Sequence, residues 1–556
     1  MTTLRRGGEI LVEALLRHGA NRAFCVPGES YLAVLDALYD CRDRLTLHVC
    51  RHDGGAAYMA EAYGKLTGRP GLCFVTRGPG ATNAAIAVHV ARQDSTPMIL
   101  FVGQVPRRHL GFEAFQEVDY AAFFGPIAKH VEQVDDASDI AEAVRRGFRL
   151  ATTGRPGPVV IALPEDVLRE EAQADDLVPA VPEPPRAPAP DALAAIRDAL
   201  ARARRPMVMI GGSVWTDPAR ADLVRFLDTS GLAACCSFRR QDVLDNDHPA
   251  YAGYLGLNAD PRLFRRVGGA DVLLVIGARL DEPTTQGFRL LDDARARALI
   301  HVYPSRAELG RVFTPTLAVE CDIEPFVAAL AALDITPGAG WAAQREEARA
   351  EYLESLRPAP AARDDFADLG RIMEELEESL PEDAIIALDA GNFTAWPQRY
   401  LTYKRPGRLL APVNGAMGYG GPAAVSAALT RPDSLVIGVI GDGGMLMNGM
   451  ELATAVQYGA RPIFLVINNN MYGTIRLHQE RAFPRRPIAT DLVNPDFKAL
   501  AESLGAFGVR VERTGDFGPA FRAARKSGKA ALIEIVTDPD ILTPNFTISG
   551  LQAASD

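Results

Sequence analysis

The stretch that decides the fold is GDGGMLMNGMELATAVQYGARPIFLVINNNMYG, residues 441–473. It follows an apolar run, LVIGVIGD (435–442), that reads as a buried strand ending in glycines, and glycine lets a backbone approach a phosphate closely. A helical pattern, MELATAVQYG (450–459), comes next, and the N-terminus of a helix favours an anion. A second apolar run, PIFLVIN (462–468), predicts another strand that ends in asparagines.

The polar residues at the ends of these two strands are candidates for a cation site. If the strands are neighbours, Asp442 and Asn469 converge on one hard cation, and Mg²⁺ suits oxygen ligands completed by phosphates. A GDG turn or an asparagine pair is common in loops, so neither alone indicates a metal. Their combination across a strand–loop–helix–strand–loop unit is the specific signal.

Short apolar runs with helical stretches between them recur along the whole chain. Such runs suit strands that are buried on both faces, which is the pattern of parallel sheets in α/β proteins. We therefore predict an α/β fold of three doubly wound domains with mostly parallel sheets. The runs that support this are GLCFVT (71–76), PMILFVG (97–103), PVVIALP (158–164), PMVMIGG (206–212), DVLLVIG (271–277), AIIALD (384–389), LVIGVIGD (435–442), PIFLVIN (462–468) and ALIEIV (531–536).

Two proline-rich segments divide the chain. VPAVPEPPRAPAPDA (178–192) reads as an extended connector, and LRPAPAARDD (356–365) follows a charged helical stretch. These connectors predict domains at 1–175, 190–335 and 365–545.

Composition excludes several functional classes. The chain has 556 residues, 48% of them hydrophobic and 23% charged, and a net charge of -11 with acids and bases interspersed. This balance argues against a nucleic-acid or anionic-membrane surface, and no segment resembles a membrane span. The N-terminus reads as a helix rather than a signal peptide. The seven cysteines form no CxxC pair and no zinc spacing, which indicates core thiols in a cytoplasmic protein.

The 441–473 segment resembles the thiamine diphosphate signature of the acetolactate synthase and pyruvate oxidase group. The resemblance implies that Asp442, Asn469 and the backbone carbonyl of Met471 bind Mg²⁺, which holds the cofactor diphosphate. It also places further residues of the segment against the cofactor, namely Gly441, Gly443, Gly444, Met445, Tyr472 and Gly473.

Two further segments of the C-terminal third match the same family. NGAMGYG (414–420) resembles the family's GxMGxG segment, which implies that Met417 wedges between the two cofactor rings and that Gly415 offers its carbonyl to the aminopyrimidine. DAGN (389–392) resembles the other diphosphate-side loop, and this implies that Gly391 and Asn392 contact the cofactor.

The N-terminal third resembles the pyrimidine-binding domain of these enzymes. The matching segments are RHDGGAAYMAEAYGKLTGRPGLCFVTRGPGATN (51–83), AFQEVDY (114–120), PIAKH (126–130) and VPGE (26–29). They imply active-site positions for Phe115, Gln116 and Lys129, and cofactor contacts for Pro27, Gly28 and Asn83. In the family the two halves of the cofactor site come from different subunits, which implies a homodimer or homotetramer with active sites at the subunit interface.

The catalytic acid departs from the family pattern. There, the cofactor's own amino group removes the thiazolium C2 proton, and a glutamate bonded to N1′ promotes this step. This chain has His52-Asp53 where the family has His-Glu, so about 1.5 Å of reach has to come from backbone movement or water. We predict that Asp53 serves N1′. Glu29 is a second candidate, because VPGE approaches the same pocket.

The functional resemblance is to the acetolactate synthase large subunit, a thiamine diphosphate-dependent carboligase that decarboxylates pyruvate and joins the product to a second 2-oxo acid. His478 stands where these synthases carry an acceptor-pocket tryptophan, which favours either a more polar acceptor or a surface histidine. IGARLDEPTTQG (276–287) resembles the synthases' flavin-contacting loop, so Arg279 is a candidate FAD contact and FAD binding is left open. Another thiamine-dependent 2-oxo acid decarboxylase or lyase, and a catalytically impaired paralogue, also stay open. Any regulatory subunit is expected to be a separate chain.

Overall fold

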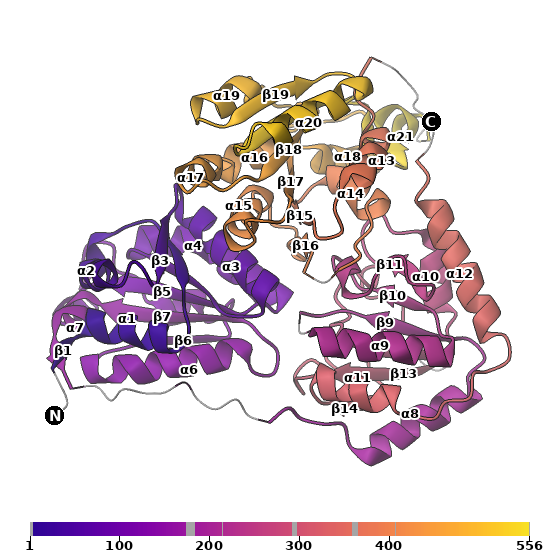
Figure 1. Cartoon of the computed structure of the whole chain (residues 1–556), viewed down its shortest axis with the longest axis horizontal. Coiled ribbons are helices and arrows are strands. Elements are labelled where there is room, and N and C mark those ends of the chain that lie inside the picture. Colours follow the sequence, from indigo (N-terminus) through magenta and orange to yellow (C-terminus); the bar gives the residue numbers. More distant parts are fainter. Residues whose placement is uncertain are drawn as a thin grey trace.

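The computed structural model describes residues 4–173, 179, 184–213, 215–291, 297–358, 365–405 and 407–554. It contains three parallel six-stranded sheets, each covered by helices, and Figure 1 shows them as three domains arranged around a common centre. Residues 178 and 180–183 of the proline-rich 178–192 segment and residues 359–364 of the second connector lie outside the described residues. The described part of the first connector, 184–189, has no regular secondary structure, and a helix begins at Pro190.

The N-terminal domain is built on the strand order β3-β2-β4-β5-β7-β6. Its strands are β2 (Arg22–Cys25), β3 (Thr46–Val49), β4 (Gly71–Val75), β5 (Met98–Gln104), β6 (His130–Gln133) and β7 (Pro158–Pro164), and the short pair β1 (Arg5–Arg6) and β8 (Glu171–Ala172) is antiparallel. Its helices are α1 (Gly7–Arg17), α2 (Leu32–Asp40), α3 (Asp53–Thr67), α4 (Gly78–Asp94), α5 (Tyr120–Phe124), α6 (Ile140–Thr152) and α7 (Glu165–Arg169). The helix predicted near the N-terminus is α1.

The middle domain has the order β11-β10-β9-β12-β13-β14. The strands are β9 (Pro206–Ile210), β10 (Ala234–Cys236), β11 (Tyr251–Tyr254), β12 (Val272–Ile276), β13 (Ala298–Tyr303) and β14 (Leu317–Glu320). The helices are α8 (Pro190–Arg202), α9 (Asp217–Ser230), α10 (Pro261–Gly268), α11 (Ile323–Ala331) and α12 (Trp341–Ser355). The charged helical stretch predicted before the second connector is α12.

The C-terminal domain has the order β16-β15-β17-β18-β20-β19. Its strands are β15 (Ile385–Leu388), β16 (Leu409–Leu410), β17 (Val436–Gly441), β18 (Ile463–Asn468), β19 (Phe507–Val511) and β20 (Ala531–Val536), with an antiparallel pair β21 (Ile541–Thr543) and β22 (Phe546–Thr547). Its helices are α13 (Leu369–Ser379), α14 (Ala395–Tyr400), α15 (Gly420–Thr430), α16 (Asp442–Asn448), α17 (Glu451–Gln457), α18 (Gly473–Ala482), α19 (Phe497–Ser503), α20 (Phe517–Lys526) and α21 (Ile548–Ala553).

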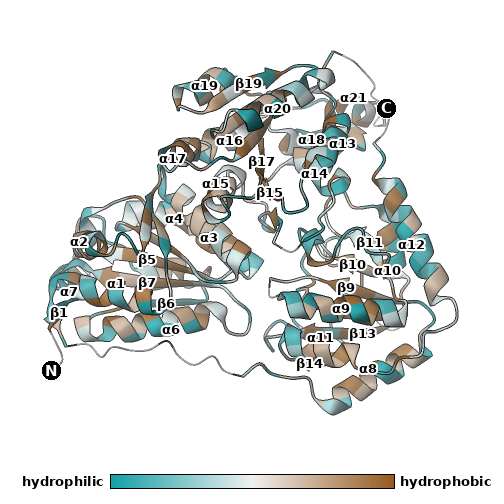
Figure 2. Cartoon of the chain, in the orientation of Figure 1, coloured by the Kyte–Doolittle hydropathy of each residue, from teal (hydrophilic) through white to brown (hydrophobic). Residues whose placement is uncertain are grey.

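Hydrophobic burial explains why the central strands form. All nine predicted runs are strands, and their residues are almost entirely buried, as Figure 2 shows by the brown strands inside more polar helix faces. All seven cysteines are buried and unpaired, as expected for core thiols. No helix in the described ranges is both long and apolar enough to cross a membrane.

The N-terminal and C-terminal domains share one hydrophobic core. Helix α3 packs against α15, and one cluster of buried side chains runs from Tyr58 and Met59 to Tyr419 and Ala423. Both helices are rich in glycine and alanine, which allows their backbones to approach closely. The hydroxyl of Ser426 donates to the carbonyl of Met59 at 2.7 Å. These two domains of one chain therefore form a continuous packed unit.

Asp94 stands where all three domains meet. Its Oδ1 accepts from the backbone N–H of Val413 in the C-terminal domain at 2.8 Å, and its Oδ2 pairs with Lys65 of its own domain. Its backbone carbonyl accepts from Arg240 of the middle domain at 2.9 Å. Asp94 is 3% exposed, so this junction is sealed from water.

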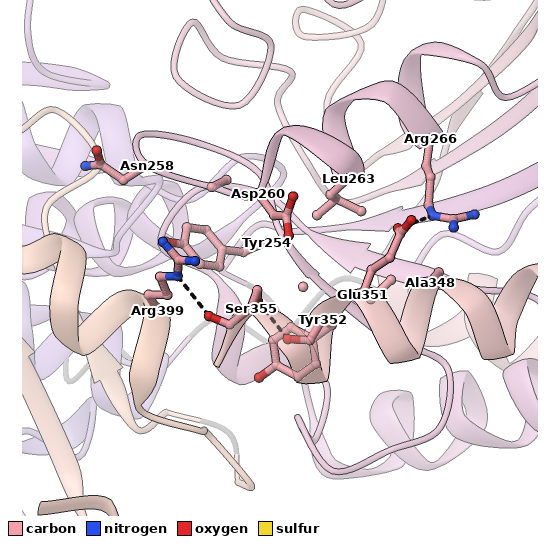
Figure 3. A pocket seen from close by; sticks show the side chains of 13 residues that line it. Tyr254, Asn258, Asp260, Leu263, Arg266, Ala348, Glu351, Tyr352, Ser355 and Arg399 are labelled. Carbon is pink, nitrogen blue, oxygen red and sulfur yellow. Dashed lines mark hydrogen bonds and ion pairs between the residues drawn. The ribbon is translucent and has the colours of Figure 1, made fainter. Parts of the chain in front are cut away.

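A second seam joins α12 to the C-terminal domain. Figure 3 shows Arg399 of α14 pointing to the carbonyl of Ser355 at the end of α12, at 2.8 Å, while Arg266 pairs with Glu351 further along the helix. The cavity between these residues is about 30 Å³ and has room for about one water. We assign this seam a structural role.

Candidate active site

The C-terminal sheet places two glycine-containing loops side by side. Strands β15 and β17 are paired in parallel, and the strand order reverses between them. Residues 389–392 follow β15, and residues 441–444 follow β17. In doubly wound sheets ligands bind at such a reversal, beyond the carboxyl ends of the strands. Strand β18 is the next neighbour of β17, so the premise of the predicted cation site is confirmed.

A cavity of about 390 Å³ opens at this edge. Twelve of the residues predicted from the sequence to contact the cofactor or the cation line this cavity together. They are Gly391, Asn392, Gly415, Met417, Gly441, Asp442, Gly443, Gly444, Asn469, Met471, Tyr472 and Gly473. Met445 does not line the cavity and is 1% exposed, so its side chain lies in the core.

The helix after the first strand differs from the prediction. The sequence pattern indicated one helix over 450–459, whereas α16 begins at Asp442 and a separate helix, α17, begins at Glu451. The break falls at Gly449, where a Cβ atom would lie 2.3 Å from the carbonyl oxygen of Met445. The helix N-terminus therefore starts at the GDG turn itself.

Two hydrogen bonds orient the carboxylate of Asp442. Its Oδ1 accepts from the N–H of Gly443 at 2.8 Å, and its Oδ2 accepts from the side-chain amide of Asn494 at 2.9 Å. Burial raises the pKa of Asp442, and these donors oppose the rise. Asn494 also donates to the side-chain oxygens of Asn468 and Asn470, at 3.0 and 3.2 Å. Sequence reasoning missed Asn494, which comes from a distant loop that carries no local motif.

The two adjacent asparagines have different roles. Asn468 is 5% exposed and donates to Glu534 at 2.8 Å, so it belongs to the interior of the sheet. Asn469 lines the cavity, and its Oδ1 accepts only a long hydrogen bond, at 3.3 Å, from the N–H of Met471. The residues that line the cavity here carry a carboxylate, an amide oxygen and a backbone carbonyl, and oxygens of these kinds fit Mg²⁺. No cluster of three or more His, Cys, Asp or Glu side chains with metal-binding geometry occurs in the described ranges.

Two buried charged residues to which the sequence assigned no role, Asp389 and Arg239, fix the cavity wall. The Oδ1 atom of Asp389 accepts from the N–H groups of Gly418 and Tyr419 at 2.7 and 3.2 Å, and burial raises the pKa of Asp389 to about 6. Arg239 of the middle domain lines the cavity and donates to the carbonyls of Pro412 and Asp389 at 2.5 and 3.2 Å. Burial lowers the pKa of Arg239 to about 10. Together they hold the turn that carries Met417.

A second group of predicted residues converges in the N-terminal domain. Asp53 is the first residue of α3, and its Oδ2 accepts from the side chain of Asn83 at 3.3 Å. A Cβ atom on Gly80 would lie 3.0 Å from Oδ1 of Asp53, and one on Gly28 would lie 2.4 Å from Cβ of Thr76. The carbonyl of Gln116 accepts from the N–H of Gly78 at 2.9 Å. These residues gather at the carboxyl ends of β2 and β4, the reversal point of this sheet.

Two acceptors in this N-terminal cluster have no donor. Oδ1 of Asp53 and Oε1 of Gln116 are buried atoms without a hydrogen-bond partner among the described residues. Buried polar atoms usually find partners, so these two fit donors supplied by a bound ligand.

The N-terminal cluster does not join the C-terminal cavity within one chain. Among the described residues, none of those lining the cavity belongs to the N-terminal domain. Pro27 is exposed and Phe115 is 75% exposed. Glu29 has 60% of its side chain exposed and lies 3.4 Å from Arg77. The N-terminal cluster therefore adds no described residue to the lining of the C-terminal cavity within one chain.

Three predicted residues lie elsewhere. His478 is on the exposed face of α18 and does not line the cavity, which agrees with the surface-histidine interpretation. Lys129 lies in a cleft of about 960 Å³ between the N-terminal and middle domains, donates to the carbonyl of Thr153 at 2.6 Å, and has its pKa lowered to about 8 by burial. Arg279 contacts Glu308 at 3.2 Å and the carbonyl of Gln93 at 2.6 Å.

Comparisons with known proteins agree with this geometry. The N-terminal TPP binding domain of thiamine pyrophosphate enzymes matches residues 5–123, the central domain matches 193–330, and the C-terminal TPP binding domain matches 389–535. The probable acetolactate synthase large subunit of Methanocaldococcus jannaschii is 31% identical over 96% of this chain and 92% of its own length. Acetolactate synthase isozyme 2 large subunit of Escherichia coli is 30% identical over 96% of this chain and 95% of its own length.

The chain belongs to the thiamine pyrophosphate enzyme family, whose cofactor is also called thiamine diphosphate. It is a thiamine diphosphate-dependent enzyme of the carboligase and decarboxylase type. A relative from Parasynechococcus marenigrum, an acetolactate synthase large subunit, is 31% identical over 95% of this chain and 87% of its own length.

Proposed function

We propose that this enzyme decarboxylates a 2-oxo acid, pyruvate in the first instance, and joins the product to a second 2-oxo acid, as an acetolactate synthase does. The observation that carries the proposal is the cavity in which Asp442, Asn469 and Met471 face Met417 across the ends of β17 and β18. The names of the relatives support this choice of substrate. Thiamine diphosphate, when bound, supplies the electron sink for the decarboxylation.

We propose Mg²⁺ as the cation, held by Asp442, Asn469 and the carbonyl of Met471. The hydrogen bond from Asn494 keeps the Asp442 carboxylate oriented, and the N–H groups at the start of α16 favour the anionic diphosphate. Met417, placed by the bonds from its neighbours to Asp389, supports the cofactor rings. Asp53 holds a proton on the aminopyrimidine from the other half of the site.

The proposed assembly is a homodimer or homotetramer in which the N-terminal cluster of one subunit covers the C-terminal cavity of another. The separation of the two halves within one chain supports it, as do exposed apolar side chains on both of them. These are Ile86 on α4, 42% exposed, and Leu446 and Met447 on α16, 48% and 51% exposed. The name "large subunit" of the relatives supports a separate regulatory subunit. The buried thiols support a cytoplasmic location.

We propose that Arg279 is an interdomain contact rather than a flavin contact. Glu308 links it to Arg155, so Arg279, Glu308 and Arg155 form a buried ion cluster beside Gln93. FAD binding by the middle domain stays a prediction, and no step of the proposed reaction uses it.

The test is turnover of purified protein with pyruvate, thiamine diphosphate and Mg²⁺, followed by nuclear magnetic resonance analysis of the products. Acetolactate is the expected product. Carbon dioxide with acetaldehyde alone would overturn the carboligation and leave a decarboxylase. Cofactor binding without consumption of pyruvate would overturn pyruvate as the substrate.

A further inference from the structure

Glu451 reaches from the C-terminal domain into the N-terminal domain. It is the first residue of α17 and is fully buried. Its Oε1 accepts from the backbone N–H groups of Arg51 and His52, both at 3.0 Å. Its Oε2 accepts from the N–H of Arg51 at 3.2 Å and from the hydroxyl of Thr454 at 2.5 Å. The carboxylate thus has donors on both oxygens.

The other end of α17 holds the same segment. Tyr458, at the C-cap of α17, accepts from the N–H of Val49 at 2.7 Å through its hydroxyl oxygen, and Gln457 accepts from the guanidinium of Arg51 at 2.6 Å. Segment 49–52 is therefore fixed at three backbone N–H groups by one helix of another domain. This segment ends immediately before Asp53.

The position of Asp53 depends on that segment. The N–H groups at the start of a helix, and of the residues just before it, have no acceptor within the helix. Glu451 supplies that acceptor for Arg51 and His52, which precede α3. Asp53 itself receives one long hydrogen bond, from Asn83, and its Oδ1 has no partner. Because the side chain is short and weakly held, its reach is set by the backbone.

Packing around the Glu451 carboxylate is close. A Cβ atom on Gly55, in the first turn of α3, would lie 2.3 Å from Oε1 of Glu451. Gly55 has no left-handed backbone angle, so alanine is compatible with its helical conformation. Burial raises the pKa of Glu451, while the hydrogen bonds from Thr454, Arg51 and His52 lower it. Burying a carboxylate costs free energy unless hydrogen bonds compensate, so an apolar side chain would fill this space at lower cost. The carboxylate is therefore better explained by the N–H groups that it holds.

We propose that Glu451 is a positioning residue for Asp53: by holding the N–H groups of Arg51 and His52, it sets the backbone so that the shorter aspartate reaches the cofactor ring. The inference rests on the proposed role of Asp53. An aspartate in place of the family's glutamate needs the backbone to lie closer to the ring, and Glu451 of α17 provides that shift.

The principal variants are Glu451→Gln and Gly55→Ala. Glutamine keeps Oε1 for the two N–H groups but places an N–H₂ group where Arg51 and Thr454 donate, so the segment shifts while the volume stays the same. The Cβ atom of alanine at position 55 displaces the carboxylate of Glu451 without changing its chemistry. This variant tests the proposal independently if Glu451→Gln does not fold. Thr454→Val is the matched control, because it removes the neighbouring hydroxyl and leaves both backbone contacts.

The first readout is exchange of the C2 proton of bound thiamine diphosphate, followed by nuclear magnetic resonance in the full enzyme. It needs no substrate, so it tests Glu451 even where pyruvate is the wrong substrate. Both principal variants are expected to slow exchange by about ten- to a hundredfold, because a misplacement of about 1 Å costs on the order of a hundredfold. Thr454→Val is expected to stay within about threefold.

The second readout separates positioning from a structural role. Amide hydrogen exchange of the 49–53 segment, measured without cofactor, is expected to rise in both principal variants, while the KM for pyruvate stays within about twofold. In an Asp53→Ala background, Glu451→Gln is expected to slow C2 exchange no further, because residues that act through one another are not additive.

Additive effects in the double variant, or unchanged C2 exchange despite lost amide protection, would overturn the proposal. Fast C2 exchange in Asp53→Ala alone would overturn the role of Asp53 and the Glu451 proposal with it. Normal C2 exchange in wild type without turnover of pyruvate would overturn only the proposed substrate.

Discussion

The side-chain amide of Asn494 donates to Oδ2 of Asp442 at 2.9 Å, from a loop far along the chain from the GDG turn. Together with the bond from the N–H of Gly443 to Oδ1, it gives each carboxylate oxygen of Asp442 one hydrogen bond, and the two bonds fix the rotation of the side chain. The candidate cation site therefore depends on a residue outside the segment that identifies it.

Replacing Asn494 with alanine is expected to weaken Mg²⁺-dependent cofactor binding by about ten- to a hundredfold. The variant leaves Oδ2 of Asp442 without the Asn494 donor, at about 1–3 kcal/mol, and removes one of the two donors to Oδ1 of Asn468. Isothermal titration with thiamine diphosphate at several Mg²⁺ concentrations measures it. Asn21→Ala, at an exposed position just before β2, is the control, and equal affinities in the two variants would contradict the role of Asn494.

Replacing Asp53 with asparagine is expected to lower kcat by at least about a hundredfold with little change in cofactor affinity. Asparagine keeps the size of the side chain and its contact with Asn83 but cannot hold a negative charge against a protonated ring nitrogen. Steady-state kinetics beside fluorescence titration of the cofactor separates the two effects. A kcat within threefold of wild type would remove Asp53 from the mechanism.

Replacing His478 with alanine is expected to leave kcat/KM for both donor and acceptor within about twofold. The side chain is exposed and does not line the cavity. Ile475→Ala, on the same helix, is the comparison, because Ile475 does line the cavity and its truncation is expected to change the acceptor preference. A large effect of His478→Ala would mean that the helix moves in the assembled enzyme.

The stability of the cofactor-free protein is expected to depend on pH through Asp389. Its folded-state pKa is raised to about 6 by burial, above the value of an unfolded aspartate, so its favourable contribution is complete below about pH 4 and is lost as pH rises through 6. A shift of about two pKa units corresponds to about 3 kcal/mol. Asp389→Asn lacks this titration, so the difference in urea midpoint between the two proteins should change between about pH 4 and 6 and be constant above about pH 7. A constant difference throughout would contradict the raised pKa.

Replacing Ile86 with glutamate is expected to shift the protein toward monomers and to abolish tight cofactor binding. Ile86 lies on the exposed face of α4, one turn from Asn83, where the proposed subunit contact forms. Sedimentation velocity measures the association. Leu353→Glu, at an exposed apolar position on α12, is the control, and a monomeric wild-type protein with full activity would contradict the interface.

The strands that sequence patterns predicted are the central ones. Runs such as 97–103 and 462–468 are buried on both faces, so their composition alone marks them. The edge strands β3, β6, β11, β14, β16 and β19 were not predicted, because most are short or carry polar residues on a face that is open to solvent. In β13, the polar residue His301 interrupts the apolar pattern. Its ring is nevertheless buried, because Nε2 forms a hydrogen bond with the carbonyl of Ala278 at 2.8 Å.

The candidate site divides in the same way. Residues in contiguous motifs, such as Asp442 and Asn469, were found because their spacing carries the signal. Asn494, Arg239 and Glu451 were missed, because each acts through the chain fold on a motif that lies elsewhere in the sequence. Their roles depend on hydrogen bonds between distant segments, which local composition does not encode.

The junction at Asp94 has a consequence for how this protein can be taken apart. Asp94 binds a lysine of its own domain, a backbone N–H of the C-terminal domain and an arginine of the middle domain, so removing either of those two domains takes a hydrogen-bond partner from this buried residue. A chimaera made with a related enzyme by exchanging domains at the proline-rich connectors would therefore keep each sheet but lose the Asp94 contacts that hold the domains together. The unit that can be exchanged intact is the whole chain.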